Sequence, residues 1–119
     1  MNPAYLDFLS SLKNASLAGN KTVTLPFSKF SLSLAKTLKD NHYIGDFSQK
    51  DDQLIITQPQ VKQLTFFSTP GRRFYQKASR LPWGTDKNSL IIISTSAGLM
   101  SQRQAQKQQI GGEVIVEIN

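Results

Sequence analysis

The chain has 119 residues, enough for one or two small domains but too few for a large α/β barrel. Hydrophobic residues make up 39% and charged residues 18%, a composition that favours folding over disorder. The chain has no cysteine and one histidine, which excludes disulfides, cysteine-based zinc sites and thiol nucleophiles. Fourteen Lys and Arg residues against eight Asp and Glu residues give a net charge of +6. This charge favours polyanionic partners, first nucleic acid and second an anionic membrane surface.

The first half of the chain is expected to form an α-β-α-β-β unit, because helical and alternating apolar patterns follow one another between turn residues. The expected elements are a helix from Asn2-Pro3 to Gly19-Asn20, a strand over 22–25 limited by Pro26, a helix capped by Ser28 and ended by Asn41-His42, a hairpin of strands 44–47 and 54–57, and a third strand over 61–67.

The second half is expected to be mostly antiparallel β structure with one short helix. Its expected features are a turn at Pro70-Gly71, a basic and aromatic segment over 72–77, a break over 81–84, a buried strand over 90–93, a polar turn over 94–98, a polar helix over 101–109 and, after Gly111-Gly112, an alternating strand over 113–118. The fold class is therefore α+β. We expect an N-terminal α/β domain over 1–69 and a C-terminal β-rich domain over 70–119.

The sequence predicts no membrane-spanning segment. The longest strongly apolar run, residues 90–93, is far shorter than the roughly 20 residues that a spanning helix needs. The first residues also lack the basic region and apolar core of a signal peptide, and they include Asp7. We therefore expect a soluble, internal protein.

Three small hydroxyl residues, Ser94-Thr95-Ser96, lie between the expected buried strand and Gly98. Hydroxyl groups bind bases and phosphates alike, so this stretch is suited to a nucleic-acid groove. An ordinary strand-to-turn transition is the alternative, because serine and threonine favour turns by themselves. A catalytic serine is a third interpretation, but it needs a base, and His42 is the sole histidine. We therefore expect neither an enzyme nor a cofactor or small-molecule substrate.

Basic and aromatic residues alternate over 72–77. On a strand, Arg73, Tyr75 and Lys77 would share one face, which suits phosphate contact and stacking on a base. The alternative is a solvated strand face with Phe74 turned to the core. Lysines also surround the second helix; Lys29, near its start, could bind phosphate, whereas Lys36 and Lys39 are equally explained as a solvated face. Arg103 and Lys107 are spaced to share one helix face.

The C-terminal third reads Ser94-Thr95-Ser96-x-Gly98, Leu99-Met100-Ser101, Arg103-x-Ala105 and Gly111-Gly112-Glu113 before the last strand. It resembles small ribosomal subunit protein eight of bacterial type, whose hallmarks are the Ser-Thr-Ser-x-Gly and Gly-Gly-Glu elements. Further matching elements cover nearly all of the chain: Asn2-Pro3 with Asp7, Lys13-Asn14-Ala15, residues 23–29, Tyr43-Ile44 with Asp46-Phe47, Pro70-Gly71-x-Arg73-x-Tyr75 and Leu81-Pro82.

The resemblance implies a two-domain α+β protein that binds the central domain of small-subunit rRNA early in assembly and supports translation. Small-subunit proteins five and twelve are the implied protein neighbours. The resemblance places the Ser-Thr-Ser loop against RNA, with the Gly-Gly-Glu segment packed beside it. Together with the basic segments, this predicts the following rRNA-binding residues: Ser94, Thr95, Ser96, Gly98, Arg103, Gly111, Gly112, Glu113, Arg72, Arg73, Tyr75, Lys77, Lys13, Asn14, Ser28 and Lys29.

The chain departs from the family pattern where Ala97 replaces a lysine, Gln102 an aspartate and Gln106 an arginine. The missing lysine should flatten the salt dependence of RNA binding by about one charge, and Arg72 compensates in part. Such drift fits an organellar ribosome or a reduced bacterial lineage, and the mitochondrial matrix is favoured over the bacterial cytoplasm. A stand-alone basic RNA-binding protein outside the ribosome is the alternative function.

Overall fold

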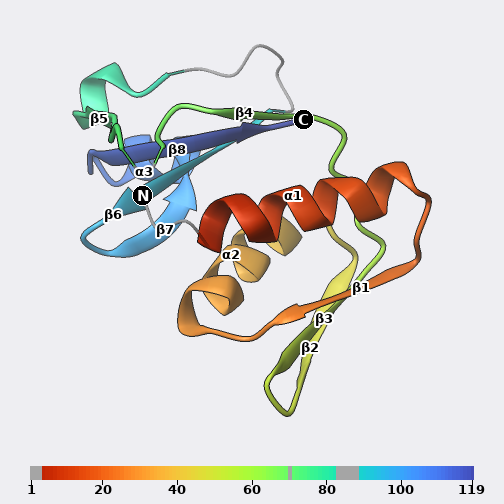
Figure 1. The fold of residues 1–119 in the computed structure, drawn as a ribbon. Coiled ribbons are helices and arrows are strands. Elements are labelled where there is room, and N and C mark those ends of the chain that lie inside the picture. Colours follow the sequence, from red (N-terminus) through yellow and green to blue (C-terminus); the bar gives the residue numbers. More distant parts are fainter. Residues whose placement is uncertain (1–3, 70, 83–88) are drawn as a thin grey trace. The chain divides into compact units, whose positions relative to one another are not determined.

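A computed structural model describes residues 4–69, 71–82 and 89–119 (Figure 1). The fold is α+β, as predicted, and the chain divides into two compact units, Ala4–Gln63 and Leu64–Asn119. The predictions for Asn2-Pro3, Pro70 and residues 83–84 lie outside the described residues. No helix in the described part of the chain is long and apolar enough to span a membrane.

The N-terminal unit contains the predicted two helices and hairpin. Its elements are α1 (Ala4–Leu17), β1 (Thr22–Pro26), α2 (Lys29–Asp40), β2 (Asp46–Lys50) and β3 (Gln53–Thr57). The three strands form an antiparallel sheet in the order β1-β3-β2 (Figure 1). Strand β1 ends at Pro26, as predicted, and includes this proline as its last residue, paired with Gln53; an edge strand tolerates proline because one side of it needs no hydrogen bonds.

Helix α2 begins where the sequence predicts it, because Ser28 forms a reciprocal cap with Ser31. The Ser28 hydroxyl accepts from the Ser31 N–H at 3.0 Å, and the Ser31 hydroxyl accepts from the Ser28 N–H at 2.8 Å. The apolar face of α2 buries Leu34 and Leu38 completely, and Phe30 packs edge-on against Tyr5 of α1 with ring centroids 4.3 Å apart. Capping and apolar spacing together therefore fix this helix.

An ion pair joins α2 to β2. The Lys39 ammonium donates to the Asp46 carboxylate at 3.0 Å and lies 5.7 Å from the centre of the Phe47 ring. The pKa of Asp46 is lowered below its ordinary value, mainly because Lys39 donates a hydrogen bond to the carboxylate and secondly because the Phe47 N–H donates another. Both partners are exposed, so the pair agrees with the solvated-face interpretation of Lys39.

Replacing Lys39 with methionine is expected to raise the pKa of Asp46 toward the ordinary aspartate value, because its main hydrogen-bond donor and nearest positive charge disappear. A pKa lowered by folding adds stability above the unfolded pKa, and that contribution is lost as pH falls through the folded pKa. The stability difference between wild type and Lys39→Met should therefore vanish in acid. Carboxyl NMR titration checks the pKa, and an unchanged Asp46 pKa would contradict the pairing.

The C-terminal unit is built on an antiparallel sheet with β8 at its centre. Its elements are β4 (Leu64–Phe66), β5 (Tyr75–Gln76), the 3-10 helix η1 (Ala78–Arg80), β6 (Leu90–Thr95), β7 (Gly98–Ser101), α3 (Gln102–Lys107) and β8 (Gly112–Ile118). The strand order is β4-β8-β6-β7, and β5 also pairs with β8 (Figure 1). The predicted buried strand, polar helix and closing strand are thus confirmed.

Three details of this unit differ from the sequence prediction. The strand predicted over 61–67 is limited to Leu64–Phe66 and pairs with β8. Within the segment 72–77, only Tyr75 and Gln76 are in a strand, so the six-residue alternation of faces is wrong. Strand β7 was not predicted. Strand β4 precedes the predicted domain limit at residue 69, and the domain limits themselves stay a prediction.

Strand β8 is buried from Glu113 to Ile118 rather than on alternate residues, because it lies inside the sheet and side chains cover both its faces. One face contributes Val114 to a buried cluster that also contains Leu81, Ile91, Ile93 and Ala105. Glu113 and Glu117 are only 8% and 4% exposed. The apparent polar face of this strand is therefore not a solvated one.

Candidate nucleic-acid interface

A row across the sheet brings together three segments that are distant in the sequence. Tyr75 of β5 lies opposite Glu113 of β8, and Glu113 lies opposite Ser94 of β6. Residues directly opposite one another in antiparallel strands project to the same face, and two strand spacings separate Tyr75 from Ser94 by roughly 10 Å. The aromatic, glycine-rich and hydroxyl motifs of the sequence thus share one surface.

The predicted polar loop over 94–98 is a tight β-hairpin. Ser94 and Thr95 belong to β6, Ser96 and Ala97 form the turn, and Gly98 begins β7 opposite Thr95. The Thr95 hydroxyl donates to the Gly98 carbonyl at 2.8 Å and accepts from the Ala97 N–H at 3.1 Å. Thr95 therefore holds the turn in shape, whereas the exposed Ser96 presents its side chain at the tip.

Gly111 and Gly112 lie where two backbones approach β8 closely. A Cβ on Gly112 would collide with the Ser94 carbonyl oxygen. A Cβ on Gly111 would lie 2.5 Å from the Gln76 carbonyl oxygen and 2.8 Å from the Lys77 Cα. The glycine pair therefore does more than end a helix: it lets the hairpin and the basic segment pack against the start of β8.

Ser68 anchors the basic segment on β8. Its buried hydroxyl donates to the Val114 carbonyl at 2.6 Å and accepts from the Phe74 N–H at 3.0 Å, and the Val114 N–H donates to the Phe74 carbonyl at 2.8 Å. Phe74 is 39% exposed and stacks on Phe67, with ring centroids 6.2 Å apart. The expectation that Phe74 turns to the core is thus met only in part.

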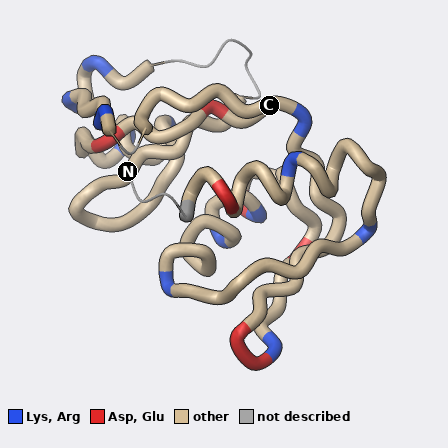
Figure 2. Tube along the Cα trace, in the orientation of Figure 1, with Lys and Arg blue, Asp and Glu red and all other residues tan. Residues whose placement is uncertain are grey.

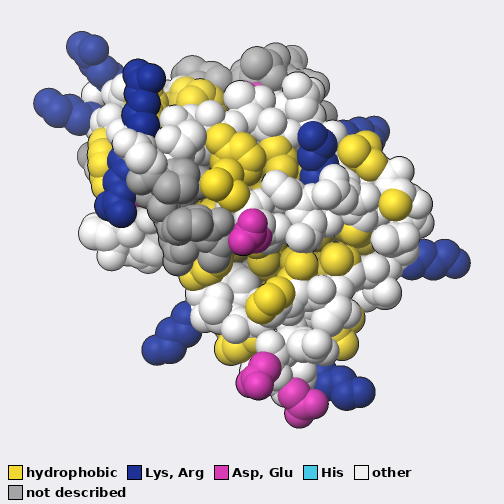
Figure 3. Space-filling model, viewed as in Figure 1, with side chains coloured by type: hydrophobic (Ala, Val, Ile, Leu, Met, Phe, Trp, Pro, Cys, Tyr) yellow, Lys and Arg dark blue, Asp and Glu magenta, His cyan; other side chains and the backbone are white. Residues whose placement is uncertain are grey.

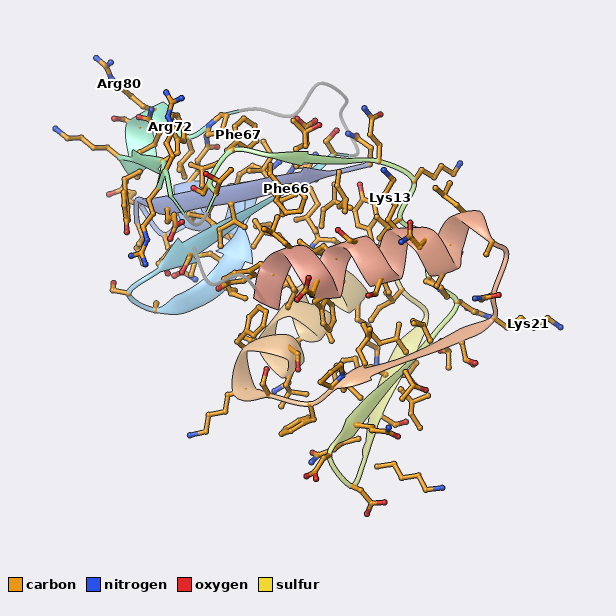
Figure 4. The ribbon with its side chains drawn as sticks, in the orientation of Figure 1. Lys13, Lys21, Phe66, Phe67, Arg72 and Arg80 are labelled. Atoms are coloured by element: carbon orange, nitrogen blue, oxygen red, sulfur yellow. The ribbon has the colours of Figure 1, made fainter. Side chains whose placement is uncertain are left out.

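The exposed charges described in the C-terminal unit are all positive. The basic side chains are exposed, while Glu113 and Glu117 are buried. The described basic residues of this unit are Arg72, Arg73, Lys77, Arg80, Arg103 and Lys107. Figures 2 and 3 show Lys and Arg gathered at the end that carries β5 and η1, and Figure 4 shows Arg80 extending away from the ribbon there. The surface therefore suits a polyanion.

The side chains of Arg73 and Tyr75 interact. Tyr75 raises the pKa of Arg73 above its ordinary value, first by a side-chain hydrogen bond and then electrostatically, and Glu113 adds to this effect. The Tyr75 side chain is 60% exposed. An aromatic ring held beside a guanidinium can stack on a base while the guanidinium contacts phosphate.

A groove of about 680 Å³ lies between the 75–80 segment and the glycine pair, lined among others by Tyr75, Lys77, Arg80, Gln109 and Gly111. The sequence prediction missed Arg80 and Gln109. The density of basic residues from position 72 to 80 could have indicated Arg80. Gln109 carries no such signal, because it reaches the groove through its left-handed backbone (φ 56°) after α3.

Gln102 is buried at the start of α3 and completes the edge of β6. Its Oε1 accepts from the Ile91 N–H at 2.8 Å, and its Nε2 donates to the Ser89 carbonyl at 3.2 Å. Arg103, the next residue, is exposed. The amide side chain thus bonds the part of β6 that β7 does not reach.

The other predicted site residues lie in the N-terminal unit. Lys13 and Asn14 are in the C-terminal part of α1, and Lys29 is the exposed first residue of α2. Ser28 uses its hydroxyl in the helix cap. Their role in RNA binding stays a prediction. Among the described residues, no group of His, Cys, Asp and Glu is placed to hold a metal ion.

Comparison with known proteins identifies the family. The sequence model of the family described as "Ribosomal protein S8" matches residues 4–119. The chain is 36% identical to "Small ribosomal subunit protein uS8" of Trichodesmium erythraeum, over 96% of this chain and 95% of that protein. It is 35% identical to the protein of the same name from Thermosynechococcus vestitus, over 97% and 96%. These matches support a structural, non-enzymatic role in the small ribosomal subunit, and the chain belongs to the ribosomal protein S8 family.

Proposed function

We propose that the chain binds the central domain of small-subunit rRNA through the face that carries Tyr75, Glu113 and Ser94. The observation that carries this proposal is the row of these residues across three strands of a unit in which all the exposed charges described are positive. Ser96 at the hairpin tip enters an irregular RNA helix and reads its shape and bases, while the basic residues hold the phosphates. Lys13, Asn14 and Lys29 add backbone contacts from the N-terminal unit.

The finer assignments follow from the family resemblance. We propose small-subunit proteins five and twelve as neighbours and the mitochondrial ribosome as the compartment, because the chain departs from the family at Ala97, Gln102 and Gln106. Crosslinking the protein to RNA in cells tests the compartment, since the sequence of the crosslinked rRNA distinguishes a mitochondrial from a bacterial ribosome. Crosslinks to a bacterial rRNA would contradict the mitochondrial assignment.

Replacing Ser96 with tryptophan is expected to abolish specific binding to a central-domain rRNA fragment. The indole is too large for an RNA groove that the serine side chain enters. Ser96 is exposed at a turn of the protein, so the fold should tolerate the change. We expect a loss of about 100-fold in affinity, corresponding to two or three lost contacts of about 1 kcal/mol each. Fluorescence anisotropy with the labelled fragment measures it, with an unrelated duplex RNA as the non-specific reference.

Lys77→Gln is the control for this experiment, because it removes one positive charge and leaves the hairpin intact. It should weaken binding to both RNAs and lower the salt slope by about one charge. If Ser96→Trp weakened binding to both RNAs equally, the hairpin would not be the part that recognises the fragment.

A further inference from the structure

We propose that the groove between the 75–80 segment and Gly111 binds an unpaired nucleotide of RNA. The inference rests on the proposed function, since it concerns the same unit and the same class of ligand. It adds a second contact region, on the other side of the glycine pair from the Ser96 hairpin. Gly112 approaches Ser94 on one side, and Gly111 approaches Gln76 and Lys77 on the other.

The groove has the size of a ligand site. Its volume of about 680 Å³ falls within the roughly 300–1,000 Å³ of typical small-molecule sites. A second hollow of about 460 Å³ adjoins it and shares Lys77, Ala78 and Gln109 with it, and Gln106 of α3 extends its lining. The two hollows provide room for a nucleotide and part of its neighbour along one strand.

The lining has the chemistry of a nucleotide site. The ring of Tyr75 is 60% exposed at the groove and offers a stacking surface. Lys77 and Arg80 supply positive charge for phosphate, and none of the described residues that line either hollow is acidic. The amides of Gln106 and Gln109 each carry donors and acceptors, as the edges of bases do. A peptide with acidic side chains would neutralise the positive charges, but its carboxylates would neither stack on the Tyr75 ring nor match both the donors and the acceptors of the Gln106 and Gln109 amides.

An unpaired strand fits this groove better than a duplex. Proteins that recognise RNA bases usually stack splayed-out bases on aromatic rings and bond their edges, which base pairing prevents. Gly111 and Gly112 line the groove without adding a side chain to it, so the exposed Tyr75 ring is the aromatic surface that a base meets there. The Ser96 hairpin and the groove would then contact different parts of one irregular RNA.

The test fills the groove without changing charge. Ala78 lines both hollows, so Ala78→Leu places apolar bulk in the path of a nucleotide. We expect about 10-fold weaker binding of the whole chain to short oligoadenylate, which is within the contribution of one base–aromatic stack. Binding to a short blunt RNA duplex should stay unchanged and also shows that the variant is folded. Equal losses for the two RNAs, or no loss for either, would overturn the proposal.

A charge pair provides a second variant, in case Ala78→Leu disturbs η1. Arg80→Gln and Lys107→Gln each remove one exposed positive charge, but Arg80 lines the groove and Lys107 lies on α3 outside both hollows. The dissociation constant for oligoadenylate should be about 5-fold higher for Arg80→Gln than for Lys107→Gln, as expected for a lost phosphate contact. Equal effects would mean general electrostatic attraction only and would overturn the proposal.

These outcomes are separate from the test of the proposed function. If Ser96→Trp abolishes binding to the rRNA fragment while Ala78→Leu leaves oligoadenylate binding unchanged, the groove proposal alone fails. If Ala78→Leu weakens oligoadenylate binding while Ser96→Trp leaves fragment binding unchanged, the hairpin assignment alone fails. If a polyglutamate peptide binds in a way that Ala78→Leu prevents and oligoadenylate does not bind, the occupant is a protein and the groove proposal is wrong.

Discussion

Replacing Gly112 with alanine is expected to destabilise the C-terminal unit by about 2–3 kcal/mol, at the upper end of the cost of overpacking. The new Cβ would collide with the Ser94 carbonyl oxygen and lie 3.2 Å from the Thr95 Cα, and both are backbone atoms of the neighbouring strand. Relief requires β6 and β8 to separate where the predicted RNA-binding row crosses them. Urea unfolding followed by circular dichroism measures the loss, and amide hydrogen exchange shows whether it is concentrated in β6 and β8.

Two other glycines serve as matched controls for Gly112→Ala. Gly71→Ala should be close to neutral, because no atom of the described residues beyond its chain neighbours lies within 4 Å of its Cβ position. Gly98→Ala has the same open space but a φ of 115°, so backbone strain alone should cost about 1–2 kcal/mol. If Gly112→Ala were as stable as Gly71→Ala, the strands would yield easily at this point, and close packing could not explain the glycine.

Much of the fold could be predicted because its signals are local. Ser28 has the side chain and the position of a helix cap, and the structure shows that cap. The hairpin between β2 and β3 turns at Asp51-Asp52, where Asp51 adopts a left-handed backbone (φ 55°) that aspartate tolerates better than most residues. The apolar run from Leu90 to Ile93 also predicted a buried strand correctly, because no polar residue interrupts it.

The strand pairings could not be predicted, because they depend on distant residues. The residues of β4 read as a continuation of the first half, yet they pair with Ile118 and its neighbours at the end of the chain. Strand β7 follows the two-residue turn Ser96-Ala97, and this pair of residues is not a typical signal for a hairpin turn. The alternation of β8 suggested one exposed face, whereas flanking strands on both edges and side chains on both faces bury Glu113 and Glu117.

The candidate site was predicted as residue types rather than as geometry. The sequence indicated hydroxyl, basic and aromatic residues, and the structure brings Tyr75, Glu113 and Ser94 into one row. The sequence could not indicate that the Thr95 hydroxyl forms hydrogen bonds within the turn, because these bonds depend on the strand register that places Thr95 opposite Gly98. The roles of such residues follow from pairing, which no single-residue preference encodes.

Replacing Gln102 with leucine is expected to destabilise the C-terminal unit by about 2–3 kcal/mol, although leucine fills a similar volume. The change leaves the buried Ile91 N–H without its acceptor and removes the donor to the Ser89 carbonyl. Gln104→Leu on the exposed side of the same helix is the control and should be close to neutral. Urea unfolding of the two variants side by side measures the difference.

Gln102→Asp separates the two hydrogen bonds of this amide. An aspartate carboxylate can accept from the Ile91 N–H but cannot donate to the Ser89 carbonyl. It should therefore lose part of the stability that Gln102→Leu loses. If all three proteins unfolded at the same urea concentration, the amide would contribute nothing net to the edge of β6. A graded loss from glutamine to aspartate to leucine would mean that both hydrogen bonds of the amide stabilise the edge of β6.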